Sequence, residues 1–289
     1  MTIAAALPVP APRDEVRRIV VAAGSSFAAG MRVLPRARRD AIFAVYAFCR
    51  IVDDIADGDG EPVTKRLRLD WWEEEVGRAF QGRPRSAVGD ELARAARDHD
   101  LPMAELLLVV EGMRMDAGVI VAPDPATLDR YVRCVAGAAG ILSMRVFGAW
   151  TGERSRRFAL ALAKGMQLVN ILRDVEEDAG MGRLYLPRPL LEAAGVPPDP
   201  GLAPGHPSLP EVRQRLGVAA RSQFTRAGQL ARGHAYPRVL PALLMMGPYE
   251  RLLRDMEADW TAAPSRRAGW LKAADGAGCA ARGLLGRAA

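Results

Sequence analysis

The sequence predicts an all-α protein. Alanine and leucine are abundant and aromatic residues make up only 6% of the chain, a composition that favours helices over sheets. Apolar residues recur at helical spacing over long stretches, most clearly over residues 36–57 and 155–179. A chain of 289 residues can form one large domain or two smaller ones. We expect a disordered leader over residues 1–13 and a single all-helical domain over residues 14–289.

The expected helices follow one another with proline and glycine at their ends. Pro35 is well placed to begin the second helix, and Gly58 and Gly60 end it. The run PDPATLDRYV supplies a later helix start, with Thr127 as the expected cap. Residues 196–210 are rich in proline and glycine and predict an exposed loop within the domain. The main expected helices span residues 14–30, 36–57, 63–82, 88–99, 102–117, 155–179, 211–233 and 237–258, with a final frayed helix after residue 263.

Two of these stretches carry aspartates at a shared spacing. Asp53 and Asp57 are four residues apart, and so are Asp174 and Asp178. Positions four apart on an α-helix point within about 40° of each other, so each pair presents two carboxylates on one face. Further polar residues extend both faces: Tyr46 and Arg50 on the first, Gln167 and Asn170 on the second.

Like charges at this spacing repel each other, and a cation would relieve the repulsion. Carboxylate oxygens suit Mg²⁺, which is commonly held by one or two carboxylates together with the phosphates of a substrate. Arginines beside the aspartates, Arg50, Arg173 and Arg183, can grip phosphate in a bidentate manner. The residues therefore predict a site for a metal ion and a diphosphate, although a pair of exposed helix faces would show the same spacing.

A di-iron site is the other metal centre that paired acidic helices can build. Such bundles use Glu-x-x-His ligands. The chain has three histidines, and none lies beside the aspartates in sequence: His99, His206 and His234. Iron is therefore not expected.

Three long segments resemble the squalene/phytoene synthase family, the head-to-head trans-prenyltransferases. They are GSSFAAGMRVLPRARRDAIFAVYAFCRIVDDIAD, YVRCVAGAAGILSMRVFG and GMQLVNILRDVEEDAGMGRLYLP, in the order of the family and over about residues 24–190. Within the family, the GSSF start, the CRIVDDIAD form and the APDPATLDRYV segment are most similar to bacterial presqualene diphosphate synthases of the hopanoid pathway.

The resemblance implies an isoprenoid-synthase-type helical bundle around a central cavity. It implies Mg²⁺-dependent head-to-head condensation of two farnesyl diphosphates to presqualene diphosphate, with release of diphosphate. One substrate ionises, its C1 attacks the 2,3 double bond of the other, and loss of a proton closes a cyclopropane. Sibling activities stay open, namely phytoene synthase, NADPH-dependent squalene synthase and hydroxysqualene synthase. A non-catalytic assembly factor with the same fold is a remote alternative.

The resemblance also implies roles for individual residues. Tyr131 matches a tyrosine near the reacting carbons, where it would orient groups or relay the proton; a tyrosine of the core with a bonded hydroxyl is the alternative. The segment VAGAAG would line the prenyl tunnel or pack closely against a helix, and Asp116 belongs either to the surface or to the site. The implied magnesium ligands are Asp53, Asp57, Asp174 and Asp178, and the implied substrate-binding residues are Ser26, Phe27, Tyr46, Arg50, Gln167, Asn170, Arg173 and Arg183. For Ser26, a helix cap or kink is equally compatible with the sequence.

Charge and cysteine usage limit the partners and the compartment. A net charge of +6 suits nucleic acid, an anionic membrane surface or an anionic substrate. No nucleic-acid-binding module is visible, so prenyl diphosphates are the expected partners, with peripheral contact with the inner membrane surface and contact with downstream pathway enzymes as further expectations. The first residues lack the basic region of a signal peptide, and no apolar run is long enough to span a membrane. Three scattered cysteines fit reduced thiols, so we expect a cytoplasmic protein.

Overall fold

The computed structural model describes residues 11–24, 27–262 and 268–286, and in this part of the chain the protein is helical, as the sequence predicts. The first half contains α1 (Pro12–Ala22), α2 (Ala28–Arg32), α3 (Arg36–Asp57), α4 (Pro62–Phe80), α5 (Ala87–His99), α6 (Met103–Ala117), α7 (Pro125–Val132), the π-helix η1 (Arg133–Gly137) and α8 (Ala138–Val146). The second half contains α9 (Glu153–Arg173), α10 (Val175–Gly180), α11 (Arg188–Ala193), α12 (Leu209–Ala231), α13 (Tyr236–Ala258) and α14 (Gly269–Leu285). Extended pairing in the described residues is limited to one isolated bridge, between Val121 and Leu184.

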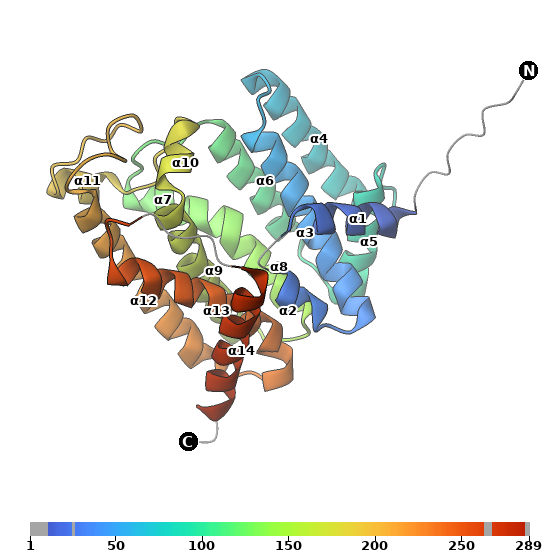
Figure 1. Ribbon diagram of the computed structural model, residues 1–289. Helices are drawn as coiled ribbons and strands as arrows, with labels where there is room; N and C mark the ends of the chain where they lie inside the picture. Colours follow the sequence, from blue (N-terminus) through green and yellow to red (C-terminus); the bar gives the residue numbers. More distant parts are fainter. Residues whose placement is uncertain (1–10, 25–26, 263–267, 287–289) are drawn as a thin grey trace, which may run out of the picture.

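Helix α3, which carries Asp53 and Asp57, and helix α9, which ends just before Asp174, lie within the bundle and are covered by their neighbours (Figure 1). Helix α3 packs against α1, α5 and α6, while α9 packs against α8, η1 and α12. Large apolar side chains on both helices, such as Phe48 and Phe158, are fully buried in the shared core. Burial of that kind contributes about 2 kcal/mol or more for each large side chain, which fixes the opposite, polar faces of the helices in place. None of the described helices has the length and apolar character needed to span a membrane.

The predicted helix over residues 36–57 is confirmed at both ends, but the first predicted helix is wrong. Helix α1 begins at Pro12, inside the expected leader, and ends at Ala22 rather than near residue 30. A turn containing Gly24, whose φ is +55°, separates it from the short helix α2. Glycine adopts this left-handed conformation at little cost, so the chain can turn there and continue in a new direction. Residues 1–10 lie outside the described part of the chain.

Two other helix predictions need correction. The helix predicted over residues 155–179 is broken at Asp174, whose φ of −101° and ψ of 15° are not helical, so that α9 and α10 are separate. The cap of α7 is Asp124 and not Thr127: the Asp124 carboxylate accepts a hydrogen bond from the Thr127 N–H at 2.8 Å. The small-residue helix also begins with a π-helical turn, η1, ahead of α8.

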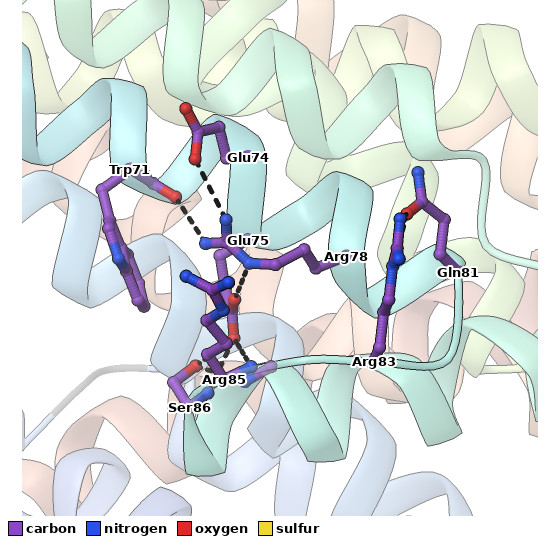
Figure 2. A network of polar contacts seen from close by, with 9 residues as sticks. Trp71, Glu74, Glu75, Arg78, Gln81, Arg83, Arg85 and Ser86 are labelled. Atoms are coloured by element: carbon purple, nitrogen blue, oxygen red, sulfur yellow. Dashed lines mark hydrogen bonds and ion pairs between the residues drawn. The ribbon is translucent and has the colours of Figure 1, made fainter.

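A buried carboxylate fixes the connection between α4 and α5. Glu75 is fully buried, and its Oε1 accepts hydrogen bonds from the backbone N–H groups of Arg85 and Ser86 and from the Ser86 hydroxyl, each at 2.8 Å (Figure 2). Its Oε2 accepts from the Arg78 guanidinium at 2.9 Å. Burial alone would raise the pKa of Glu75, but these hydrogen bonds outweigh it and lower that pKa.

Candidate active site

The helices enclose a cavity of about 540 Å³, and every predicted site residue that the structure describes lines it. Helices α3, α6, α8, α9 and α13 contribute to its walls together with η1 and α10. Ser26 lies outside the described residues. The predicted residues brought together are Phe27, Tyr46, Arg50, Asp53, Asp57, Tyr131, Gln167, Asn170, Arg173, Asp174, Asp178 and Arg183.

The first acidic wall of the cavity is the polar face of α3. The Arg50 guanidinium donates to Asp53 at 3.3 Å and pairs with Asp54 at 2.5 Å. Burial, followed by the charge of Asp57 one turn away, raises the pKa of Asp53 to about 7, although Arg50 opposes the shift. Arg50 therefore only partly offsets the cost of ionising Asp53, and a nearby cation would stabilise the ionised carboxylate.

The second acidic wall is formed where α9 ends and α10 begins. The break at Asp174 keeps Asp174 and Asp178 on the same side, because the Asp178 N–H still bonds the Asp174 carbonyl oxygen at 2.7 Å. The Arg173 guanidinium donates to the Asp174 carboxylate, with Nε to Oδ1 at 2.6 Å. Burial and then the charge of Asp174 raise the pKa of Asp178 to about 7. Both walls thus carry a carboxylate whose ionised form is disfavoured without a counter-ion.

Arg183 joins the two walls. Its Nη1 donates to Asp57 Oδ1 at 2.5 Å, and its Nη2 donates to the carbonyl oxygen of Ala56 at 3.1 Å. The residue follows α10 in sequence but reaches the C-terminal end of α3, and it is only 6% exposed. A buried guanidinium with two partners holds a fixed position, so the acidic faces of α3 and α10 are kept close to each other.

Asp116 and Tyr185 are site residues that were not among the predicted set. The Tyr131 hydroxyl donates to Asp116 Oδ2 at 3.1 Å, and the Tyr185 hydroxyl donates to Asp116 Oδ1 at 2.5 Å. The two tyrosine rings are stacked, with centroids 4.9 Å apart. Burial raises the pKa of Asp116 to about 6, against the opposing hydrogen bond from Tyr185. In the sequence, Asp116 is a single carboxylate at the end of the apolar helix α6. A single carboxylate does not show whether the residue lies at the surface or in a site.

The oxygen donors of the site fit Mg²⁺. Asn170 lines the cavity, and its Oδ1 is buried and has no hydrogen-bond partner, while its amide nitrogen donates to Gln167 Oε1 at 3.3 Å. An orphaned amide oxygen beside paired carboxylates is a donor set suited to a hard cation that completes its shell with water and phosphate oxygens. In the described residues, no three histidine, cysteine or acidic side chains converge on one point. The donors are instead divided between the two walls.

The rest of the cavity is mainly apolar. Small residues of η1 and α8 line it, including Ala136, Ala139 and Gly140, and Gly140 also packs closely against Ala159 of α9. The contribution of this segment to a prenyl tunnel stays a prediction. Larger side chains such as Phe158 and Leu162 line the same chamber from α9. A cavity with carboxylates and guanidinium groups in its lining and mainly hydrocarbon elsewhere can bind an elongated apolar molecule that ends in a charged group.

Comparisons with known proteins identify relatives over most of the chain. The squalene/phytoene synthase family matches residues 20–273. The presqualene diphosphate synthase of Zymomonas mobilis is 39% identical over 256 residues, which cover 88% of this chain and 87% of that protein. The presqualene diphosphate synthase of Rhodopseudomonas palustris is 40% identical over 231 residues, covering 79% and 82%. The phytoene synthase of Thermus thermophilus is 37% identical over 179 residues, covering 62% and 60%.

Solved structures show the same fold. A dehydrosqualene synthase crystal structure superimposes with a TM-score of 0.82 at 22% identity, covering 94% of this chain and 96% of that one. A squalene synthase from Alicyclobacillus acidocaldarius superimposes with a TM-score of 0.77 at 25% identity, covering 86% and 96%. The family resemblance predicted from the sequence is confirmed, and the chain belongs to the squalene/phytoene synthase family.

Proposed function

We propose that the protein is a presqualene diphosphate synthase, which joins two molecules of farnesyl diphosphate head to head and releases one diphosphate. The observation that carries the proposal is the meeting of two aspartate pairs and three arginines in one cavity whose other walls are mainly apolar. Relatives of about 40% identity that bear this name support the choice of product.

In this proposal Asp53, Asp57, Asp174 and Asp178 hold Mg²⁺, with Asn170 Oδ1 as a further oxygen donor. Bound Mg²⁺ would stabilise the negative charge that develops on the departing diphosphate. The guanidinium groups of Arg50, Arg173 and Arg183 would bind the diphosphate oxygens, and Arg183 is already held in place by Asp57. Because each group is in position before the reaction, little reorganisation is needed when charge develops.

The apolar chamber would hold the two prenyl chains and keep water away from the allylic cation. Mainly apolar side chains from η1, α8 and α9 form this wall, which would exclude water from the cation. Phe27 packs beside the charged end: its ring stacks on Tyr249 at 6.0 Å and meets Tyr46 edge-on at 6.5 Å. We assign these rings to closing the cavity around the diphosphate end of the substrate.

The test is product identification. The purified protein, incubated with Mg²⁺ and farnesyl diphosphate but without NADPH, is expected to release diphosphate and accumulate a cyclopropyl thirty-carbon diphosphate, detected by mass spectrometry. Formation of phytoene from geranylgeranyl diphosphate would favour the phytoene synthase alternative, which the Thermus thermophilus relative supports. Squalene or hydroxysqualene as the first product would favour the other sibling activities. No diphosphate release from any prenyl diphosphate would contradict an enzymatic role.

The pathway and the compartment follow from the same proposal. We place the reaction in squalene and hopanoid biosynthesis, where the sequence resemblance puts it. A cytoplasmic location is supported by the cysteines, since Cys49, Cys134 and Cys279 are all unpaired. Peripheral contact with the inner membrane surface is proposed because the substrate and the product are lipids and the chain carries a net charge of +6.

A further inference from the structure

Asp116 occupies an unusual position for an acidic residue in a cavity that must hold a carbocation. It is 5% exposed, it lies near the end of α6, and both of its carboxylate oxygens accept hydrogen bonds from tyrosine hydroxyls. A free carboxylate would react with an allylic cation to form an ester. Here the Tyr131 and Tyr185 hydroxyls cover the carboxylate oxygens, so the negative charge is present in the cavity but the nucleophile is shielded.

The same hydrogen bonds fix the direction of both phenol groups. The Tyr131 hydroxyl donates to Asp116 and also interacts with the Tyr185 hydroxyl. A phenol oxygen that donates its proton keeps lone pairs that can accept a further proton. Burial, followed by the Asp116 charge, raises the pKa of Tyr131, so this hydroxyl stays protonated and remains a donor to the carboxylate. Stacking on Tyr185 at an interplanar angle of 20° further limits the motion of the ring.

We propose that Asp116 is a positioning residue of the condensation, and that it receives through Tyr131 the proton lost when the cyclopropane closes. This proposal rests on the function proposed above. In this step the electrons of a C–H bond form the third carbon–carbon bond of the ring. The released proton binds the Tyr131 oxygen as the phenolic proton moves to Asp116. The two transfers are coupled, so neither a phenoxide nor a protonated phenol accumulates.

Asp116→Asn is the direct test, because the amide keeps the shape of the carboxylate but cannot accept the proton. We expect formation of the cyclopropyl diphosphate to fall by about 10²-fold or more, the usual contribution of a positioned proton acceptor. Release of diphosphate should fall much less, because ionisation depends on the aspartates and arginines of the two walls. The ratio of diphosphate released to ring-closed product should therefore rise by at least about tenfold, with prenyl alcohols or isomeric thirty-carbon products making up the difference.

Glu111→Gln is the matched control. Glu111 lies on the same helix, pairs with Arg130, and does not line the cavity. The same loss of a carboxylate should leave the product ratio at the wild-type value. Binding of farnesyl thiodiphosphate, a non-ionising analogue, measured by calorimetry, should be similar in the wild type and in both variants.

Tyr131→Phe and the double variant decide whether Asp116 acts through the tyrosine. Tyr131→Phe should raise the product ratio in the same direction, and the double variant with Asp116→Asn should be no worse than the more affected single variant, as expected for groups that act as a unit. Multiplicative losses in the double variant would overturn the relay. An unchanged ratio in Asp116→Asn would mean that another group takes the proton, and an equal fall of both rates would assign Asp116 to ionisation or structure.

Two other results, an unfolded Asp116→Asn variant and a wild type that does not condense farnesyl diphosphate, can be distinguished from a failure of the relay. If Asp116→Asn does not fold, Tyr131→Phe alone decides: this change removes the hydroxyl that passes the proton but leaves the carboxylate and its hydrogen bond from Tyr185, so the ratio should rise, and an unchanged ratio would contradict the proposal. If the wild type does not condense farnesyl diphosphate, the proposed function fails. The role of Asp116 is then judged by the same ratio on the prenyl diphosphate that the wild type does condense, since that ring closure also releases a proton.

Discussion

The Asp53→Asn variant should separate the catalytic use of the acidic walls from their cost in stability. Without metal, the pKa of Asp53 is raised to about 7 from an ordinary value of 3.8, because the carboxylate is buried beside Asp57. The full difference corresponds to an upper limit of about 4 kcal/mol of unfavourable free energy for the ionised group. Since 41% of the Asp53 side chain is exposed, solvent screening reduces the expected cost to about 1–2 kcal/mol.

The sign of this effect with pH is fixed by the raised pKa. Asp53 contributes no penalty below the pKa of the unfolded chain, and the penalty is complete once the pH exceeds about 7. We therefore expect the metal-free Asp53→Asn variant to be more stable than the wild type by about 1–2 kcal/mol at pH 8 and nearly equal to it at pH 4. At the same time the variant should lose turnover by about 10²-fold or more, as expected when one preorganised electrostatic group is removed.

Denaturant unfolding of metal-free protein at both pH values provides the measurement. Asp54→Asn is the matched control: Asp54 neighbours Asp53, is 56% exposed, does not line the cavity, and pairs with Arg50 at 2.5 Å. Loss of that exposed ion pair should change the free energy of unfolding by no more than about 0.5 kcal/mol. A destabilised Asp53→Asn variant at pH 8 would refute the interpretation of Asp53 as a carboxylate whose cost of ionisation is only partly offset by Arg50.

Three further predictions follow from the same structure. Glu75→Gln should lower the free energy of unfolding by about 2 kcal/mol at pH 7 without changing turnover, because a buried, four-fold hydrogen-bonded carboxylate loses its charge; the difference from the wild type should shrink in acid as the lowered pKa of Glu75 is passed, and denaturant titrations from pH 7 to pH 3 test this. Ala139→Phe should raise the KM for farnesyl diphosphate by about tenfold, and that for geranylgeranyl diphosphate by more, since a ring would project into the chamber; equal KM values for variant and wild type would remove Ala139 from the substrate path. Chelation of divalent ions should abolish diphosphate release, and Mg²⁺ with farnesyl thiodiphosphate, each at about 100 times its dissociation constant, should stabilise the protein by about 2.7 kcal/mol or more in thermal unfolding; the same shift from the analogue alone would argue against metal-dependent binding.

Much of the fold could be predicted because strong local signals agreed with the tertiary structure. Pro35 and Gly58 flank α3, and both of its ends were predicted correctly. The break at Asp174 was missed because apolar periodicity continues across it, so nothing local separates α9 from α10. The Thr127 cap was wrong because Asp124, three residues earlier, accepts the Thr127 N–H and begins the helix there, which places Thr127 inside the first turn.

Some residues of the candidate site could be predicted from the sequence, and others could not. The aspartates could be predicted because both pairs share a helical spacing of four residues. The arginines could be predicted because guanidinium groups beside carboxylates, among apolar residues, indicate a site for a metal ion and a phosphate. Asp116 and Tyr185 could not, because their relation is made only by the fold: 69 residues separate them in sequence, yet their hydroxyl and carboxylate oxygens are 2.5 Å apart. The orphaned Asn170 oxygen likewise becomes visible only when its surroundings are known.

The central claim is that both acidic walls bind the same metal–diphosphate group. A crystal structure with Mn²⁺ and farnesyl thiodiphosphate, with the metal located by anomalous scattering, tests it most directly. We expect metal ions in contact with carboxylates of both pairs, Asp53 with Asp57 and Asp174 with Asp178, and with the diphosphate of the analogue between them. Metal bound at one wall alone, or an analogue whose diphosphate lies away from both pairs, would contradict the claim.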